Sequence, residues 1–172
     1  MPDTPENDGP EVGLKTVYTI KGPEEATDFY DRWAEAYDRE VAENGYVTPQ
    51  RCAEALAAHA GDKTAPLMDL ACGTGLSGLA FRAAGFTCLD GYDISEGMLE
   101  KARATGAYRH LATADLSQPL EIAEGAYTHA AIVGAMSPEY MPATVLDDVL
   151  SKLPSGGCFV FSVNDHAAQD GT

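Results

Sequence analysis

Basic residues, long apolar runs and paired cysteines are scarce or absent in this sequence. Eleven Lys and Arg residues stand against 27 Asp and Glu residues, which gives a formal net charge of −16. A surface of this sign repels phosphate backbones and anionic lipid headgroups, so we expect neither a nucleic-acid partner nor a membrane surface. The longest stretch without an acidic or basic residue, 125–138, is shorter than the roughly 20 residues that span a bilayer.

Other common signatures are missing too. The four cysteines form no CxxC pair and the histidines share no spacing typical of metal ligands, so we expect neither a disulfide framework nor a metal site. The N-terminal segment lacks the apolar core of a secretory signal. These absences favour an acidic protein of the cytoplasm.

The length of 172 residues suits one domain, and a hydrophobic share of 45% is ordinary for a globular protein. Proline, glycine and acidic residues gather in the first two dozen positions. We therefore expect a flexible acidic tail over residues 1–24 and a single domain over residues 25–172.

The spacing of apolar residues predicts the elements of this domain. Repeats of three and four residues predict two N-terminal helices, near 27–41 and 48–60. The predicted strands that follow are 65–71, 86–92, 108–111, 127–134 and 158–163, and the helices between them are 76–84, 95–105 and 142–153. Such alternation is typical of an α/β, Rossmann-like fold, a doubly wound and mainly parallel sheet of about five strands. Its ligands bind at the carboxyl ends of the strands, where the two N-terminal helices would form a lid.

A glycine-rich segment connects the first of these strands to its helix. Gly73, Gly75 and Gly78 form a GxGxxG motif in the strand–turn–helix context of cofactor-binding loops. Glycines let the backbone turn sharply and approach a ligand, and the helix N-terminus offers free N–H donors. Nicotinamide dinucleotides and S-adenosylmethionine both use such a loop. Asp69 favours S-adenosylmethionine, because a carboxylate repels a pyrophosphate but attracts an ammonium and a sulfonium.

A second acidic signal lies at the end of the second strand. Asp93 follows Gly75 by 18 residues, close to the ~20-residue spacing of a carboxylate that binds ribose hydroxyls. Ribose binding fits either cofactor. A helix N-cap is the simpler alternative for Asp93, although Ser95 is an equally good cap.

Several segments resemble the class I S-adenosylmethionine-dependent methyltransferases, and the resemblance covers about residues 27–165. These segments are YDRWAEAYD (30–38), LMDLACGTG (67–75), DIS (93–95) with Met98, ADL (114–116) and LPSGG (153–157). Within that class the chain most resembles the small Williams–Beuren-region methyltransferase-like proteins. The resemblance implies a Rossmann-like fold, S-adenosylmethionine as cofactor and a methyl acceptor.

The resemblance also implies a set of cofactor contacts. Asp69 and the glycine loop would hold the methionine end, Asp93 the ribose and Asp115 the adenine amino group. Trp33 and Tyr37 would form a lid, although an aromatic stripe at helical spacing is as often part of a core. The complete set is Trp33, Tyr37, Asp69, Ala71, Gly73, Gly75, Asp93, Ile94, Met98, Ala114, Asp115, Leu116 and Gly134.

Two departures from the family concern the acceptor side. The chain ends at Thr172, so we expect a sheet of five strands without the family's C-terminal hairpin, with an edge available to pair with a second copy. Residues 134–140, after the fourth strand, carry no histidine where the subgroup usually has one. The catalytic candidates are therefore Glu139, Tyr140 and Asp165.

Together these observations predict a methyltransferase that acts on a small molecule. Because a sulfonium is already an excellent leaving group, positioning and desolvation can supply most of the catalysis. Two alternatives stay open. The first is a non-catalytic or truncated module that binds the cofactor or dimerises. The second is an NAD(P)-dependent oxidoreductase, against which stand Asp69 and the absence of a Tyr-x-x-x-Lys pair.

Overall fold

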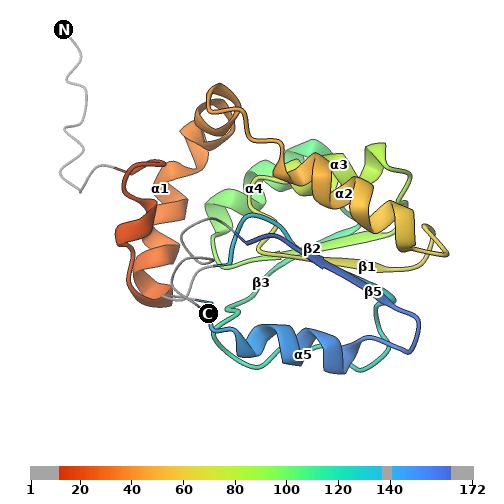
Figure 1. Cartoon of the computed structure of the whole chain (residues 1–172). Helices are drawn as coiled ribbons and strands as arrows, with labels where there is room; N and C mark the ends of the chain where they lie inside the picture. The colour runs from red at the N-terminus through yellow and green to blue at the C-terminus, as the bar shows by residue number, and fades with distance from the viewer. Residues whose placement is uncertain (1–11, 137–140, 164–172) are drawn as a thin grey trace, which may run out of the picture.

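The computed structural model describes residues 12–136 and 141–163 and contains a five-stranded, fully parallel sheet. The strand order is β3-β2-β1-β4-β5, with β1 in the centre (Figure 1). The strands are β1 (Leu67–Leu70), β2 (Leu89–Asp93), β3 (His110–Thr113), β4 (His129–Ile132) and β5 (Cys158–Phe161). The predicted α/β, Rossmann-like fold is confirmed. Its strand order reverses next to β1, which opens a crevice beyond the carboxyl ends of β1 and β4.

Helices cover both faces of the sheet and its carboxyl end. They are η1 (Val17–Thr19), α1 (Gly22–Glu43), α2 (Thr48–His59), α3 (Leu76–Ala83), α4 (Glu96–Thr105) and α5 (Thr144–Lys152). In Figure 1, α2, α3 and α4 lie on one face and α5 on the other, while α1 lies beyond the carboxyl ends of the strands. Within the described ranges, no helix combines the length and apolar character needed to cross a bilayer.

The side chains of β1 divide the interior into two cores. Met68 and Leu70 pack with Val149 of α5 on one face of the sheet. Leu67 packs with Phe81 of α3 on the other face. Because β1 is buried on both faces, its sequence is a short continuous apolar run interrupted by a single polar residue. That exception, an aspartate inside a buried strand, belongs to the candidate site.

Two boundaries differ from the prediction. α1 begins at Gly22, earlier than the predicted start near 27, and Ile20 just before it is only 2% exposed. β3 begins at His110 and not at 108, because Tyr108 turns its side chain into the interior before the strand starts.

Tyr108 occupies a slot that three glycines leave open. A Cβ atom on Gly78 would lie 2.3 Å from the Tyr108 ring, and Cβ atoms on Gly91 and Gly75 would lie 3.0 Å and 3.3 Å from it. Through this slot the Tyr108 hydroxyl reaches Asp69 and donates to its carboxylate at 2.7 Å. The last two glycines of the GxGxxG motif therefore make room for a side chain of the protein itself.

We expect Gly78→Ala to lower the free energy of unfolding by about 1–3 kcal/mol, because the added methyl group overpacks the Tyr108 slot. This loss should exceed the gain from the better helix propensity of alanine. Urea denaturation measures the difference. Gly61→Ala is the matched control, since nothing lies within 4 Å of its Cβ position. Equal stabilities of the two variants would contradict the packing role of Gly78.

Candidate functional site

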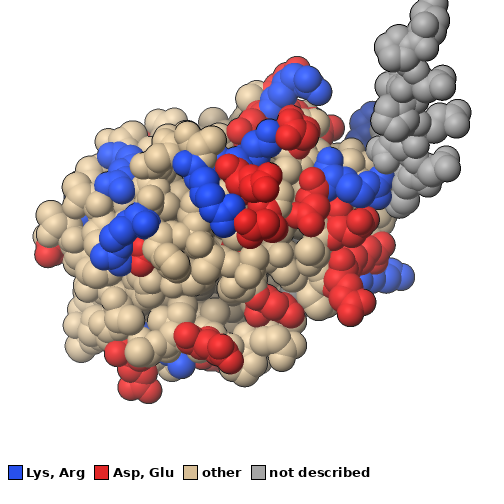
Figure 2. Space-filling model, turned by 180° about the vertical axis from the view of Figure 1, so that it is seen from behind, with Lys and Arg blue, Asp and Glu red and all other residues tan. Residues whose placement is uncertain are grey.

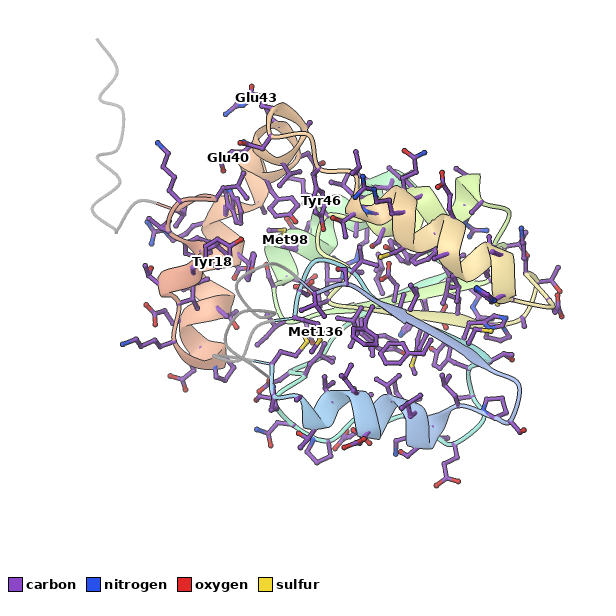
Figure 3. The ribbon with its side chains drawn as sticks, in the orientation of Figure 1. Tyr18, Glu40, Glu43, Tyr46, Met98 and Met136 are labelled. Atoms are coloured by element: carbon purple, nitrogen blue, oxygen red, sulfur yellow. The ribbon has the colours of Figure 1, made fainter. Side chains whose placement is uncertain are left out.

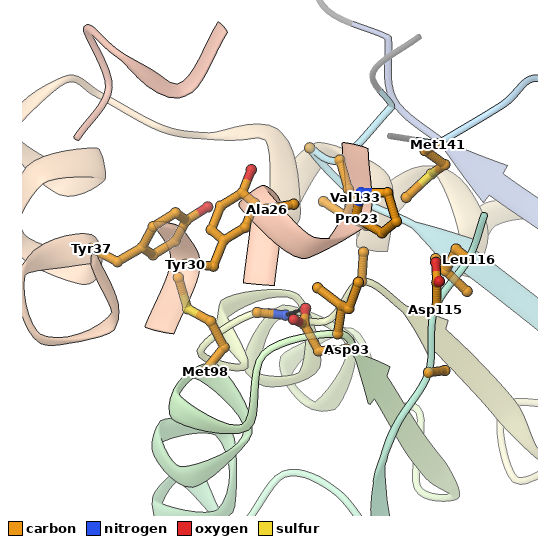
Figure 4. Close-up of a pocket in the computed structure, with 16 residues that line it drawn as sticks. Pro23, Ala26, Tyr30, Tyr37, Asp93, Met98, Asp115, Leu116, Val133 and Met141 are labelled. Carbon is orange, nitrogen blue, oxygen red and sulfur yellow. Dashed lines mark hydrogen bonds between the residues drawn. The ribbon is translucent and has the colours of Figure 1, made fainter. Parts of the chain in front are cut away.

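Most of the predicted site residues surround one pocket at the carboxyl ends of the strands, which we call the main pocket. Its walls come from the segments after β1, β2, β3 and β4, and α1 closes it from outside (Figure 4). The predicted residues that line it are Tyr37, Ala71, Gly73, Asp93, Ile94, Met98, Ala114, Asp115, Leu116 and Gly134. This is the position in which an open α/β sheet binds its ligands.

The glycine loop enters the main pocket through left-handed backbone conformations. Ala71, Gly73 and Gly75 have φ values of 55°, 54° and 95°. Nothing lies within 4 Å of a Cβ position on Gly73, so a ligand can approach the backbone there. Gly75 does not line the pocket. A Cβ on it would lie 3.2 Å from the Cα of Ala102, so this glycine allows the loop to pack closely on α4.

Asp93 lies at the end of β2 and lines the main pocket. One carboxylate oxygen accepts the Gly73 N–H at 2.8 Å and the other accepts the Ser95 N–H at 3.0 Å. Burial raises the pKa of Asp93 to about 6, although these hydrogen bonds oppose the shift. The cap of α4 is Ser95, whose Oγ accepts the Met98 N–H, and not Asp93. A carboxylate has about four acceptor positions, so Asp93 retains capacity for two ligand hydroxyls.

Asp69 lies behind the glycine loop and does not line the main pocket. It is fully buried, and its Oδ2 accepts from Ser77 Oγ at 2.6 Å and from the Tyr108 hydroxyl at 2.7 Å. Burial raises the pKa of Asp69 to about 6, and these two hydrogen bonds work against that rise. Its Oδ1 has no partner among the described residues. A water that bridges this oxygen and a ligand amino group would satisfy it, since an unpartnered buried oxygen is costly.

The lid helix α1 presents two tyrosines to the main pocket and keeps its tryptophan behind them. Tyr37 lines the pocket as predicted, and Tyr30, which the sequence analysis missed, lines it too. Trp33 does not line the main pocket. It is 2% exposed and packs against Phe29, with ring centroids 5.5 Å apart. Trp33 thus belongs to the hydrophobic cluster of α1 and not to the lining of the main pocket.

Acidic residues hold α1 against the rest of the site. Asp31 accepts from Ser95 Oγ and, at 2.9 Å, from the Gly97 N–H at the start of α4. Asp38, two helical turns further along, accepts from Thr74 Oγ1 in the glycine loop. The seven-residue separation places both carboxylates on one side of α1. The signal in the sequence is the pair of aspartates in the YDRWAEAYD segment, which are not among the predicted site residues.

Further lining residues carried no sequence signal, because small and apolar side chains look the same in a pocket wall and in a core. They are Pro23, Ala26, Val133, Ala135 and Met141.

The three catalytic candidates, Glu139, Tyr140 and Asp165, lie outside the described residues. In the part of the chain that the structure describes, no group of His, Cys, Asp or Glu residues could hold a metal ion.

The charge of the main pocket distinguishes between the two cofactor classes. Among the described residues that line it, Asp93 and Asp115 are charged and no Lys or Arg is present. A pyrophosphate would be repelled there, whereas a sulfonium would be attracted. Figure 4 shows Tyr30 and Tyr37 at one end of the pocket, Asp115 at the other and Asp93 between them. An amino acid, a ribose and an adenine joined in a row fit this order of side chains, so the residues suit S-adenosylmethionine.

Comparisons with known proteins agree with this class of site. The methyltransferase domain family matches residues 67–157 of the chain. Human methyltransferase-like protein 27 is 40% identical over 131 residues, which cover 74% of this chain and 54% of that protein. The chain thus spans about half the length of this curated relative.

Solved structures share the fold. An S-adenosylmethionine-dependent methyltransferase from Thermotoga maritima superposes with a TM-score of 0.63 at 18% identity, over 81% of this chain and 62% of that chain. A corresponding enzyme from Mesorhizobium loti gives a TM-score of 0.53 at 28% identity, over 66% of this chain and 53% of that chain. A methyltransferase from Haloferax volcanii, solved with the Trm112 activator, gives a TM-score of 0.62 at 22% identity, over 77% of this chain and 58% of that chain.

Fold and pocket together define a Rossmann-like domain for a positively charged nucleoside cofactor. The family match, which covers more than half of the chain, makes the assignment specific: the chain belongs to the methyltransferase domain family. The resemblance to the class I S-adenosylmethionine-dependent methyltransferases is thereby confirmed, with S-adenosylmethionine as the cofactor of the class.

We expect the affinity for S-adenosylhomocysteine to rise as the pH increases from 5 to 8. The raised pKa of about 6 leaves Asp93 mostly protonated at pH 5, and a protonated carboxyl is a poorer acceptor for ribose hydroxyls. One pH unit below the pKa only about a tenth of the carboxyl is ionised, so the loss is about tenfold. Calorimetric titration across this pH range measures it.

Asp147→Asn is the control for this titration. Asp147 is exposed on α5, which covers the face of the sheet opposite α2, α3 and α4 (Figure 1). This variant should keep the pH dependence of the unmodified chain. An affinity that stays constant between pH 5 and pH 8 would contradict a role for a buried carboxylate in ligand binding.

Proposed function

We propose that this domain transfers the methyl group of S-adenosylmethionine to a small-molecule acceptor. The observation that carries the proposal is the main pocket, which combines a fixed carboxylate at the end of β2, an acidic lining without Lys or Arg in the described residues, and an aromatic lid. The family of the chain supports the same reaction.

Each part of the pocket has a task in this reaction. S-adenosylmethionine, when bound, supplies a methyl group on a positively charged sulfur. Asp93 is held by two backbone N–H groups, so it can orient the ribose hydroxyls without reorganising. Asp115 accepts the Ser117 N–H through Oδ1, at 2.9 Å, which leaves Oδ2 for the adenine amino group. Tyr30 and Tyr37 exclude water from the region where the methyl group would pass.

Positioning is sufficient for much of the rate enhancement. Holding two reactants in line converts an encounter in solution into a step within one complex, which can lower the barrier by about 7–11 kcal/mol. The hydrogen bonds from α4 and the glycine loop to α1 would keep the lid over the reactants. Glu139, Tyr140 and Asp165 stay predictions as catalytic residues.

The acidic surface supports a small molecule as acceptor. Lid helix α1 carries eight acidic and two basic residues, and Figure 2 shows acidic side chains gathered on the side of the molecule that bears this helix. A nucleic acid would approach the pocket against this field. Cytoplasmic location and a homodimer that pairs through β5 likewise stay predictions.

We expect Asp93→Asn to weaken the binding of S-adenosylhomocysteine by about 10- to 100-fold, because a hydrogen bond to a charged acceptor is worth about 1.5–3 kcal/mol. Calorimetric titration of the purified chain measures this, with circular dichroism as a check that the variant is folded. NAD is the control ligand and should give no heat of binding. Tight NAD binding, or full retention of affinity in Asp93→Asn, would overturn the proposed cofactor site.

A further inference from the structure

A second cavity lies beside the main pocket, and five aromatic side chains are among the residues that line it. Its rings belong to Tyr18, Tyr30, Trp33, Tyr37 and Tyr46, and we call it the aromatic cavity. Figure 3 shows Tyr18 on the η1–α1 side, Tyr46 after α1 and Met136 after β4, around the space between the lid and the sheet. The aromatic cavity therefore lies at the same end of the fold as the main pocket.

The two cavities adjoin each other. Tyr30, Tyr37, Gly134 and Ala135 line both of them. Gly134 is exposed and has a φ of 69°, and a Cβ atom on it would lie 1.9 Å from the Tyr46 hydroxyl. Only a glycine thus allows Tyr46 to approach the end of β4. Because the two cavities adjoin along these residues, a molecule in the aromatic cavity would lie next to a cofactor in the main pocket.

The polar groups of the aromatic cavity are neutral in the described residues. Its lining there contains hydroxyl groups but no Lys, Arg, Asp or Glu. The phenol of Tyr46 stays protonated at neutral pH, because burial raises its pKa to about 12. An anion would find no positive partner in such a lining. A cation, by contrast, is attracted to the faces of aromatic rings.

A carboxylate behind one ring strengthens this preference. The indole N–H of Trp33 donates to Glu40 at 2.5 Å. A hydrogen bond to an anion moves electron density into the indole, which makes its ring faces more negative. The acidic residues of α1 add a negative field around the cavity, and such a field concentrates small cations.

From this geometry we infer that the aromatic cavity is the acceptor site and that it binds a small organic amine. The inference rests on the proposed function and specifies its substrate class. The ammonium form would be held among the rings, and the amine would release a proton to solvent before reacting. Its lone pair would then form the N–C bond as the C–S bond breaks, with the electron pair of that bond passing to sulfur and leaving S-adenosylhomocysteine.

Three para-substituted phenols of similar size, whose side chains carry different charges, test this inference. They are tyramine, a cation at neutral pH, 4-ethylphenol, which is neutral, and 4-hydroxyphenylacetate, an anion. Trp33 is the single tryptophan of the sequence and lines the aromatic cavity, so its fluorescence reports binding without turnover. Excitation at the red edge of the indole band avoids absorption by the phenols. We expect tyramine to bind about tenfold more tightly than 4-ethylphenol, and 4-hydroxyphenylacetate to bind most weakly.

Two glutamates of the lid helix provide a matched pair of variants. Glu40→Gln removes the charge behind Trp33 but keeps an oxygen acceptor, whereas Glu43→Gln removes the same charge from an exposed position on the same helix (Figure 3). We expect Glu40→Gln to weaken tyramine binding about two- to fivefold with 4-ethylphenol unchanged, and Glu43→Gln to leave both affinities nearly unaltered.

A parallel titration with S-adenosylhomocysteine distinguishes failure of the amine inference from failure of the proposed function. If S-adenosylhomocysteine binds and tyramine shows no advantage over 4-ethylphenol, the amine inference is overturned and the proposed function stands. Preferred binding of 4-hydroxyphenylacetate would overturn it as well. If tyramine binds as expected but S-adenosylhomocysteine does not, the proposed function fails, and the acceptor role of the cavity fails with it.

Discussion

The carboxylate of Asp93 joins the parts of this molecule on which the site depends. Its two oxygens accept N–H groups from Gly73, which follows β1, and from Ser95, which follows β2. Ser95 in turn caps α4 and donates its hydroxyl to Asp31 of the lid helix. One chain of hydrogen bonds therefore fixes the glycine loop, the start of α4 and the lid. Because this carboxylate also faces the main pocket, the group that organises the walls is the group that a ligand would contact.

This arrangement requires two carboxylates to be buried, which is unfavourable for their charged forms. Asp69 and Asp93 are both removed from water, and burial raises the pKa of each to about 6. Hydroxyl and amide donors compensate for the burial in part, and the Tyr108 hydroxyl is among them. The remaining oxygen of Asp69 has no partner among the described residues and lies behind the glycine loop, outside the lining of the main pocket. Asp93 does line the pocket, so a positively charged ligand there would lower the cost of burying its charge.

Much of the fold could be predicted because its signals are local. The alternation of strands and helices gave the parallel sheet, and the glycine loop with Asp69 and Asp93 indicated the cofactor class. Local signals were weaker where one pattern serves two purposes. The aromatic stripe of α1 fits a lid and a core equally well, so the prediction included Trp33, which does not line the main pocket, and missed Tyr30, which does. The start of β3 shifted for a similar reason, since Tyr108 is apolar enough to continue a strand.

The sequence by itself determined the order of the elements, the loop that receives the cofactor and the acidic character of the chain, because each depends on neighbouring residues and their spacing. Tertiary structure alone decided which distant side chains meet. It brought Tyr108 into the slot left by Gly75, Gly78 and Gly91, and it set Asp38 against Thr74. It also placed Tyr46 over Gly134, where the two cavities adjoin. Such contacts follow from the packing of helices on a twisted sheet, which no local pattern of residues encodes.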